Sequence, residues 1–227
     1  MGTLASNRKG FITGASSSSY ADAINATTGT ASDSHSATAT GIQYFQSSGR
    51  GGGTFRFIRT FLHFDTSGIT GGSSFQLQLT SGNASASDGS TNTTAIKHTA
   101  GGSNGGELAN ADFNNIDRNT VYSSSTAFGA NQTVTFTLNA AAATQIINEN
   151  DFNVALLLTH DSAEDEESPL ESDGSISNQI AFGSTIQLSY TDPASGYGHK
   201  VNAVASANIG KVNTVATANI GKINTVD

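Results

Sequence analysis

The chain lacks cysteine and tryptophan, and only two of its 227 residues are proline. Without cysteine it forms no disulfide bond and no thiolate metal site. Lysine and arginine number 10 against 18 aspartate and glutamate residues, a formal net charge of -8 that disfavours a nucleic-acid partner held through phosphate contacts. No run of about 18 apolar residues is present and residues 1–10 are polar, so we expect neither membrane insertion nor a signal peptide.

The composition is dominated by glycine and small polar residues rather than by charged ones. Glycine (25), serine (30), threonine (28) and asparagine (20) together make 103 of the 227 residues, whereas only 12% are charged. Disordered chains are usually charged and poor in aromatic residues, but this chain has 12 phenylalanines and 5 tyrosines in alternating runs. The composition therefore predicts an all-β protein with many turns and a surface of hydroxyl and amide groups.

The most strongly patterned segment covers residues 54–65, which alternate with rings on both faces. We expect a central strand that is buried on both sides. Shorter strands are predicted at residues 41–46, 75–79, 95–99, 133–138, 152–159, 179–182 and 185–190, with a loop over 81–94 and irregular chain around 113–122. Asn139 is a good N-cap for a helix over 140–148 whose Ile146 and Ile147 face the core. Together these elements predict a jelly-roll-type β-sandwich with one short helix and a C-terminal repeat tail.

The same pattern assigns structural roles within the long strand. Arg59 lies on a face rich in rings, so it should stack or form an ion pair, and Asp65 should bind N–H groups of the turn that follows. The residues predicted to be core are Phe57, Phe61, Leu62, Phe64 and Leu156.

Composition also divides the chain. Residues 1–40 are predicted to be an N-terminal arm with a first strand, and residues 41–192 the β-sandwich. Residues 193–200 contain Pro193, Gly196 and Gly198 and read as a linker. Residues 201–227 form the repeat tail.

One motif in the predicted sandwich carries a family resemblance. Residues 59–69 read Arg-Thr-Phe-Leu-His-Phe-Asp-Thr-Ser-Gly-Ile. They resemble the R-x-F-L-x-F-D-x-S-x-I signature of the DNRLRE-like (TGF-β-propeptide-like) jelly-roll domains of phage and bacterial surface proteins. Residues 138–140 with the following helix, 152–158 and 180–190 resemble later parts of that pattern, whereas the acidic run at 160–173 departs from it. The resemblance implies a structural or adhesive module rather than a catalytic one.

The acidic run at residues 160–173 holds 7 of the 18 acidic residues and no lysine or arginine. Two alternatives stay open. The run is a solvated loop kept open by like charges, or it is a weak Ca²⁺ site, since hard cations take several carboxylate oxygens. The candidate ligands are Asp161, Glu164, Asp165, Glu166 and Glu167. No other cofactor is expected.

Catalytic motifs are sparse, and we expect no enzyme activity. The five histidines form no metal-binding spacing, and the chain has neither a G-x-S-x-G nor a phosphate-binding loop. His63 and Asp65 are two residues apart, which favours a structural hydrogen-bonded pair. A hydrolase that acts on host polysaccharide is the third and weakest hypothesis.

The tail repeats with a period of 11 residues: residues 201–211 and 212–222 are two copies, and 223–227 start a third. A capped helical turn in each copy and a right-handed helical coil are alternative conformations, although Gly210 and Gly221 disfavour a long helix. The apolar positions have nothing within the tail to cover them, so we expect them to dock on another chain. They are Val201, Val204, Ile209, Val212, Val215, Ile220, Ile223 and Val226.

The tail resembles short repeats that close marine phage virion proteins. With the jelly-roll resemblance, it predicts a non-enzymatic bacteriophage virion structural protein, associated with the tail or fibre or decorating the capsid. Its expected partners are other virion proteins and further copies of itself. We expect it to assemble in the host cytoplasm and to lie on the particle surface. The alternative is a carbohydrate-binding adhesin for a host-surface glycan, with Tyr20, Tyr44, Tyr122 and Tyr197 as stacking platforms.

Overall fold

The computed structural model describes residues 1–34, 40–47, 53–86, 91–101, 106–162, 175–193, 211–212 and 215–216. Its strands are β1 (Gly2–Ala5), β2 (Arg8–Gly14), β3 (Gly29–Ser34), β4 (Thr40–Gln46), β5 (Phe55–Asp65), β6 (Ser73–Ala86), β7 (Asn92–His98), β8 (Ile116–Ala127), β9 (Thr133–Thr137), β10 (Asp151–Leu158), β11 (Ile176–Thr191), β12 (Lys211–Val212) and β13 (Val215–Ala216). Its helices are α1 (Tyr20–Ile24), the 3₁₀ helix η1 (Asn110–Asn114), α2 (Ala140–Asn148) and α3 (Thr159–Ser162). Within these described parts no helix is long and apolar enough to cross a membrane.

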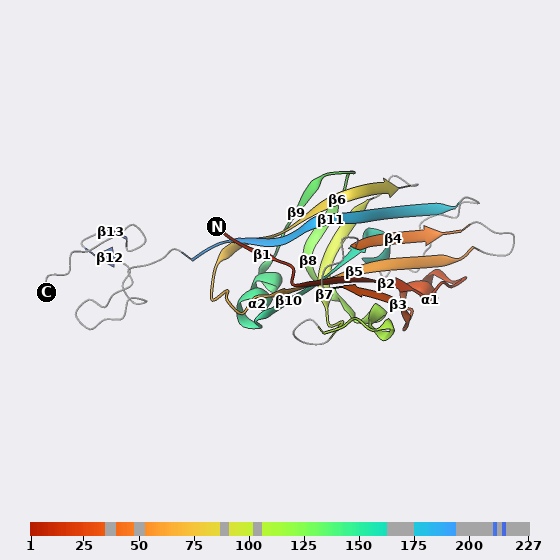
Figure 1. The fold of residues 1–227 in the computed structure, drawn as a ribbon, viewed down its shortest axis with the longest axis horizontal. Helices are drawn as coiled ribbons and strands as arrows, with labels where there is room; N and C mark the ends of the chain where they lie inside the picture. The colour runs from red at the N-terminus through yellow and green to blue at the C-terminus, as the bar shows by residue number, and fades with distance from the viewer. Residues whose placement is uncertain are drawn as a thin grey trace.

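The fold is all-β, as predicted, and one antiparallel sheet of 11 strands makes both of its layers. β5 joins the layers because it changes partner along its length: residues 55–58 pair with β4, and residues 60–65 pair with β10. In Figure 1, β7 and β8 run at a steep angle across β4, β5 and β11. Strands that pass from one layer to the other make such corners in β-sandwiches.

The two ends of the sheet order, β8 and β9, lie close together around one core. The connection between them carries Phe128, whose ring lies 5.8 Å from that of Phe136 and 5.5 Å from that of Phe182. After β9, the backbone N–H of Leu138 donates to β6 and that of Asn139 donates to β8. The sheet therefore nearly closes on itself.

The core contains all five residues predicted to be there. Phe57, Leu62, Phe64 and Leu156 are fully buried, and Phe61 is 2% exposed. β5 is buried on both faces over most of its length, which confirms the prediction from its two-sided pattern.

The N-terminal segment contributes more than an arm with one strand. β1 pairs with β11, and β2 pairs with both β3 and β5. The helix α1 follows, with the Ser19 side chain accepting from the N–H of Asp22 as an N-cap. Composition concealed these strands because the inward positions of β2 alternate large and absent side chains: Gly10, Ile12 and Gly14.

Helix α2 begins and ends where the sequence predicts. The Asn139 side chain accepts from the N–H groups of Ala141 and Ala142, and Ile146 is buried. Ile147 is only half-buried, at the edge of the core. The expectation of a single helix was wrong: α1, α3 and η1 are additional, and all are too short to show a helical period in the sequence.

Three predicted irregular stretches are strands. β6 continues to Ala86, into the loop expected over residues 81–94. β8 occupies residues 116–127, where irregular chain was expected. β11 is one strand rather than the two that were predicted. β8 and β11 both contain register shifts against their partners. Such irregularities interrupt the two-residue alternation from which a strand is predicted, and the serine-rich sequence of β6 has the composition of a loop.

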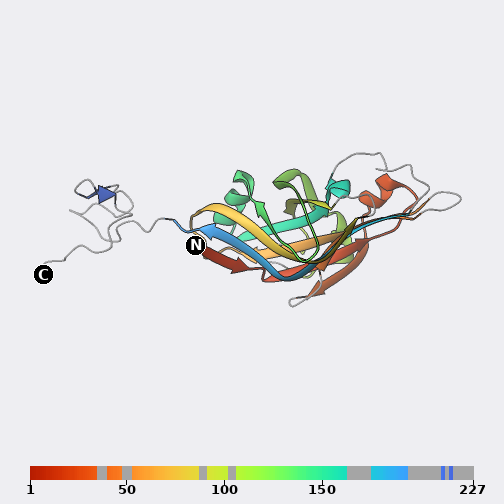
Figure 2. The same ribbon diagram turned by 90° about the horizontal axis from the view of Figure 1, so that it is seen from above.

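Figure 2 shows the four short helices on one side of the molecule and β1, β2 and β3 on the other. Among the described residues, no helix therefore covers the outer face of β2, β4, β5 and β11.

Candidate functional site

The most concentrated polar chemistry lies inside the sandwich, at Arg59 of β5. Its side chain is fully buried, and its Nε and Nη2 donate to the two carboxylate oxygens of Asp161 at 2.7 and 2.6 Å. Nη1 donates to the carbonyl of Phe113 at 2.6 Å, and Nη2 also donates to that of Ile24 at 2.5 Å. The guanidinium lies 3.8 Å from the centre of the Phe113 ring. Arg59 thus both stacks and pairs, as the sequence predicts.

Arg118 of β8 contacts two of the same partners, Asp161 and Ile24. Its Nη2 reaches the carboxylate of Asp161 at 3.4 Å and the carbonyl of Ile24 at 3.1 Å. Ile24 is the last residue of α1, so both arginines satisfy a carbonyl that a helix end leaves without an internal partner. The two arginines, Asp161, Ile24 and Phe113 tie α1, η1 and α3 to the sheet, and we call them the arginine clasp.

The clasp changes the interpretation of the acidic run. Asp161 was a candidate calcium ligand, but it is 1% exposed and its two oxygens accept from Arg59. A carboxylate in a bidentate arginine pair is not open to a cation. The other candidates, Glu164, Asp165, Glu166 and Glu167, lie outside the described residues, so a calcium site there stays a prediction without Asp161.

A second buried cluster surrounds His63. The sequence pairs this residue with Asp65, but its Nε2 instead contacts Oδ1 of Asp151 on the neighbouring strand β10. Its Nδ1 lies 2.7 Å from Oδ1 of Asn7. Asp65 is exposed at the strand end and accepts from the N–H of Ser67, which matches its predicted turn role. Hydrogen bonding from the Ser67 side chain, and then from its N–H, lowers the pKa of the Asp65 carboxyl group. Asn7 and Asp151 thus lie against the two ring nitrogens of His63, which is 4% exposed.

His98 of β7 is a buried titratable group, 3% exposed. Its Nε2 lies 3.0 Å from the carbonyl of Leu62, and its Nδ1 accepts from the N–H of Ala100, so the ring is the neutral form. Burial lowers the pKa of His98 to about 4. The ring links β7 to β5 through its hydrogen bond to the Leu62 carbonyl.

This shift predicts a loss of stability in mild acid. The unfolded chain protonates a histidine near pH 6.5, but the folded protein keeps His98 neutral down to a pKa of about 4. Between these values the unfolded state binds more protons, so the free energy of unfolding should fall by about 2 kcal/mol from pH 7 to pH 5. Urea unfolding of the native chain and of His98→Gln at both pH values measures it. Equal losses in both proteins would show that His98 is not the source.

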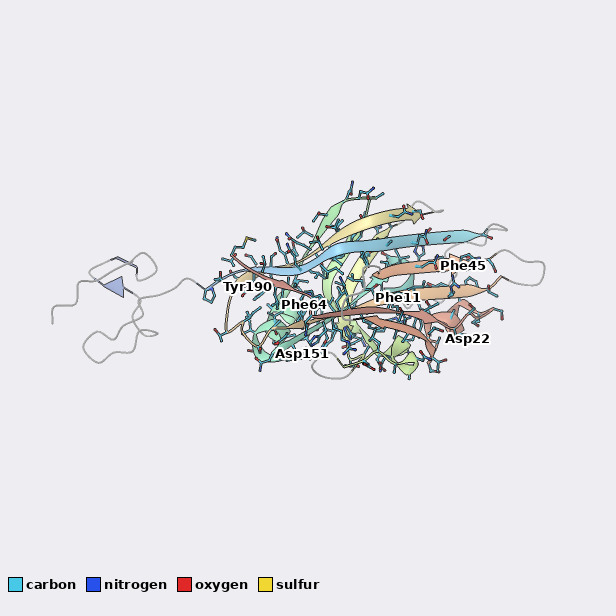
Figure 3. The ribbon with its side chains drawn as sticks, viewed as in Figure 1. Phe11, Asp22, Phe45, Phe64, Asp151 and Tyr190 are labelled. Carbon is cyan, nitrogen blue, oxygen red and sulfur yellow. The ribbon has the colours of Figure 1, made fainter. Side chains whose placement is uncertain are left out.

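The outer face of the sheet carries a groove of about 250 Å³ where β2, β4, β5, β6 and β11 meet. Its apolar lining comes from Phe11 and Ile58, and its polar lining from the amide side chains of Gln43, Asn83 and Gln179. Figure 3 labels Phe11 on β2, the strand that pairs with β5. None of these residues was singled out from the sequence, because five strands distant in the chain supply them.

The tyrosines proposed as sugar platforms do not serve as such. Tyr20 is 6% exposed, Tyr44 0% and Tyr122 1%, because their rings pack within the core against other rings and His160. Buried rings have no face open to a ligand, so this part of the adhesin hypothesis is wrong. Tyr197 lies outside the described residues.

The repeat tail is described at four residues only. Lys211–Val212 and Val215–Ala216 pair as an antiparallel hairpin in which Val212 lies opposite Val215. At these residues the chain is extended rather than helical, in keeping with the β preference of valine. The remaining predicted docking residues, Val201, Val204, Ile209, Ile220, Ile223 and Val226, lie outside the described residues.

Over the described ranges, no three histidine, cysteine or acidic residues are grouped so as to hold a metal ion. No protein-family model and no curated protein matches the chain. The resemblances to jelly-roll domains and to phage repeats therefore stay predictions.

Proposed function

We propose that the chain is a non-enzymatic structural protein of a bacteriophage particle, which assembles with further copies and with other virion proteins through its C-terminal repeat. The observation that carries this proposal is the hairpin of β12 and β13. Each strand has two residues, and an isolated hairpin of this kind is marginal in water even when longer. We infer that a repeat that adopts such a short hairpin needs a partner surface to stabilise it.

The sandwich interior supports the structural part of the proposal. Five ionisable side chains are buried and contact other side chains or the backbone. They are Arg59, Asp161, His63, Asp151 and His98. Such networks fix the arrangement of strands and helices. The resemblances of residues 59–69 and of the tail support the placement in a phage particle, associated with the tail or fibre or decorating the capsid.

The oligomeric state of the full chain tests the proposal. Native mass spectrometry of the unmodified chain should give an oligomer, and the double variant Val212→Asp/Val215→Asp should shift it to a smaller species, because two buried carboxylates without partners oppose docking. Val121→Asp is the matched control, since Val121 is 40% exposed on β8 and lies outside the repeat. A monomeric native chain, or an unchanged mass in the double variant, would contradict assembly through the tail.

A further inference from the structure

We propose that the outer-face groove binds a neutral saccharide of one or two rings. This ligand site is independent of assembly through the tail, and it replaces the buried tyrosines with a surface that a ligand can reach.

The chemistry of the lining selects the class of ligand. Among the residues that line the groove, all of them in the described chain, none is ionisable. Gln43, Asn83 and Gln179 each present a carboxamide, which both donates and accepts hydrogen bonds. Hydroxyl groups of a sugar also do both, whereas a phosphate or carboxylate only accepts and requires a compensating cation when it leaves water. The lining therefore favours an uncharged polyol over an anion.

The apolar lining suits the other side of such a ligand. Phe11 and Ile58 are half-buried, so part of each side chain faces solvent at the groove. A pyranose ring has a face of C–H groups that loses water favourably against an aromatic or aliphatic surface. Small-molecule sites commonly combine a mainly apolar lining with a few placed polar groups, and drug-sized ligands use about 300–1,000 Å³. A groove of about 250 Å³ fits a smaller ligand.

The central amide is held in place before any ligand arrives. Gln43 and Gln179 are directly opposite on β4 and β11, and Nε2 of Gln43 donates to Oε1 of Gln179 at 3.3 Å. Oε1 of Gln43 accepts from Nη2 of Arg56 at 3.2 Å. A side chain that is already fixed loses less conformational entropy on binding.

The hollow itself arises from small residues between the amides. Gly41 on β4 lies opposite Ala181 on β11, and a Cβ at Gly41 would lie 2.8 Å from the carbonyl oxygen of Ile180. Neither position fills the space above the sheet. Gly41 is needed for this close approach of two strands, so it is unsuitable for a binding test.

The double variant Gln179→Leu/Asn83→Leu tests the site at two exposed positions. Gln187→Leu is the matched control, because Gln187 lies on the same strand and donates to Gln78 in a similar amide pair outside the groove. The probes are a panel of neutral mono- and disaccharides of hexoses and N-acetylhexosamines, their sialylated and uronic-acid counterparts, and a peptide of residues 201–227. Binding to the full-length chain is measured by titration calorimetry.

We expect at least one neutral mono- or disaccharide to bind the native chain and the Gln187→Leu chain equally. The double variant should bind it at least tenfold more weakly while it unfolds at the same temperature. Absence of binding to every neutral probe, tighter binding of the acidic counterparts, or equal binding by the double variant would overturn the proposal. Displacement of a bound saccharide by the peptide would still support a saccharide site at the groove. If the peptide bound at the groove and no saccharide did, the surface would belong to the tail of a second copy instead.

Discussion

Replacing Arg59 with methionine should lower the free energy of unfolding by about 3–5 kcal/mol, the range for breaking a buried ion pair from one side. The variant leaves Asp161 buried with only the longer contact from Arg118, at 3.4 Å. It also leaves the carbonyl of Phe113 without its guanidinium donor. The apolar stem of methionine keeps most of the packing, so the loss reports the charge and the hydrogen bonds.

The control for this prediction is an ion pair at the surface. Lys97 and Glu149 are 3.7 Å apart with side chains 31% and 49% exposed, and such pairs contribute about 0–1 kcal/mol. Urea unfolding of Lys97→Met should therefore change little. The double variant Arg59→Met/Asp161→Leu should recover part of the loss, because it removes the orphaned carboxylate. If Arg59→Met destabilised the protein no more than Lys97→Met, the arginine clasp would not hold the helices to the sheet.

The elements that could be predicted from the sequence are those whose signals are local. The alternation in β5 and the cap at Asn139 each lie within about a dozen residues, and both predictions were confirmed. β8 and β11 were missed in part because register shifts break the alternation. Where the inward positions of a strand carry glycine, as in β2, the pattern loses the residues that would reveal it.

Partners were harder to predict than elements because they are set by topology. The sequence indicates that Arg59 needs a partner, but Asp161 lies 102 residues away, in a segment interpreted as an open acidic loop. The prediction paired His63 with Asp65 because they are close along the chain. In the sheet, however, His63 lies opposite Asn153 of β10, and Asp151 of the same strand is within reach. The groove shows the same limit, since it depends on which strands are neighbours in the sheet.

Replacing Phe64 with alanine is expected to cost about 3–5 kcal/mol of unfolding free energy, as much as the loss of the clasp but for a different reason. Phe64 is fully buried, and its ring lies 6.0 Å from that of Phe152 on β10. The Phe152 ring lies 5.3 Å from Tyr122 on β8. Truncation therefore leaves a cavity at one end of a row of rings that joins three strands, and a close-packed interior fills such a cavity only in part.

Two further variants separate cavity formation from a general weakness of the sheet. Phe64→Leu keeps most of the volume, so it should lose much less stability than Phe64→Ala. Val121→Ala removes an apolar side chain that is already 40% exposed, next to Tyr122, and should lie within about 1 kcal/mol of the native chain. Thermal and urea unfolding of the three variants give the comparison. A midpoint for Phe64→Ala close to that of Val121→Ala would place Phe64 outside the core, and with it the two-sided burial of β5 on which the layered arrangement depends.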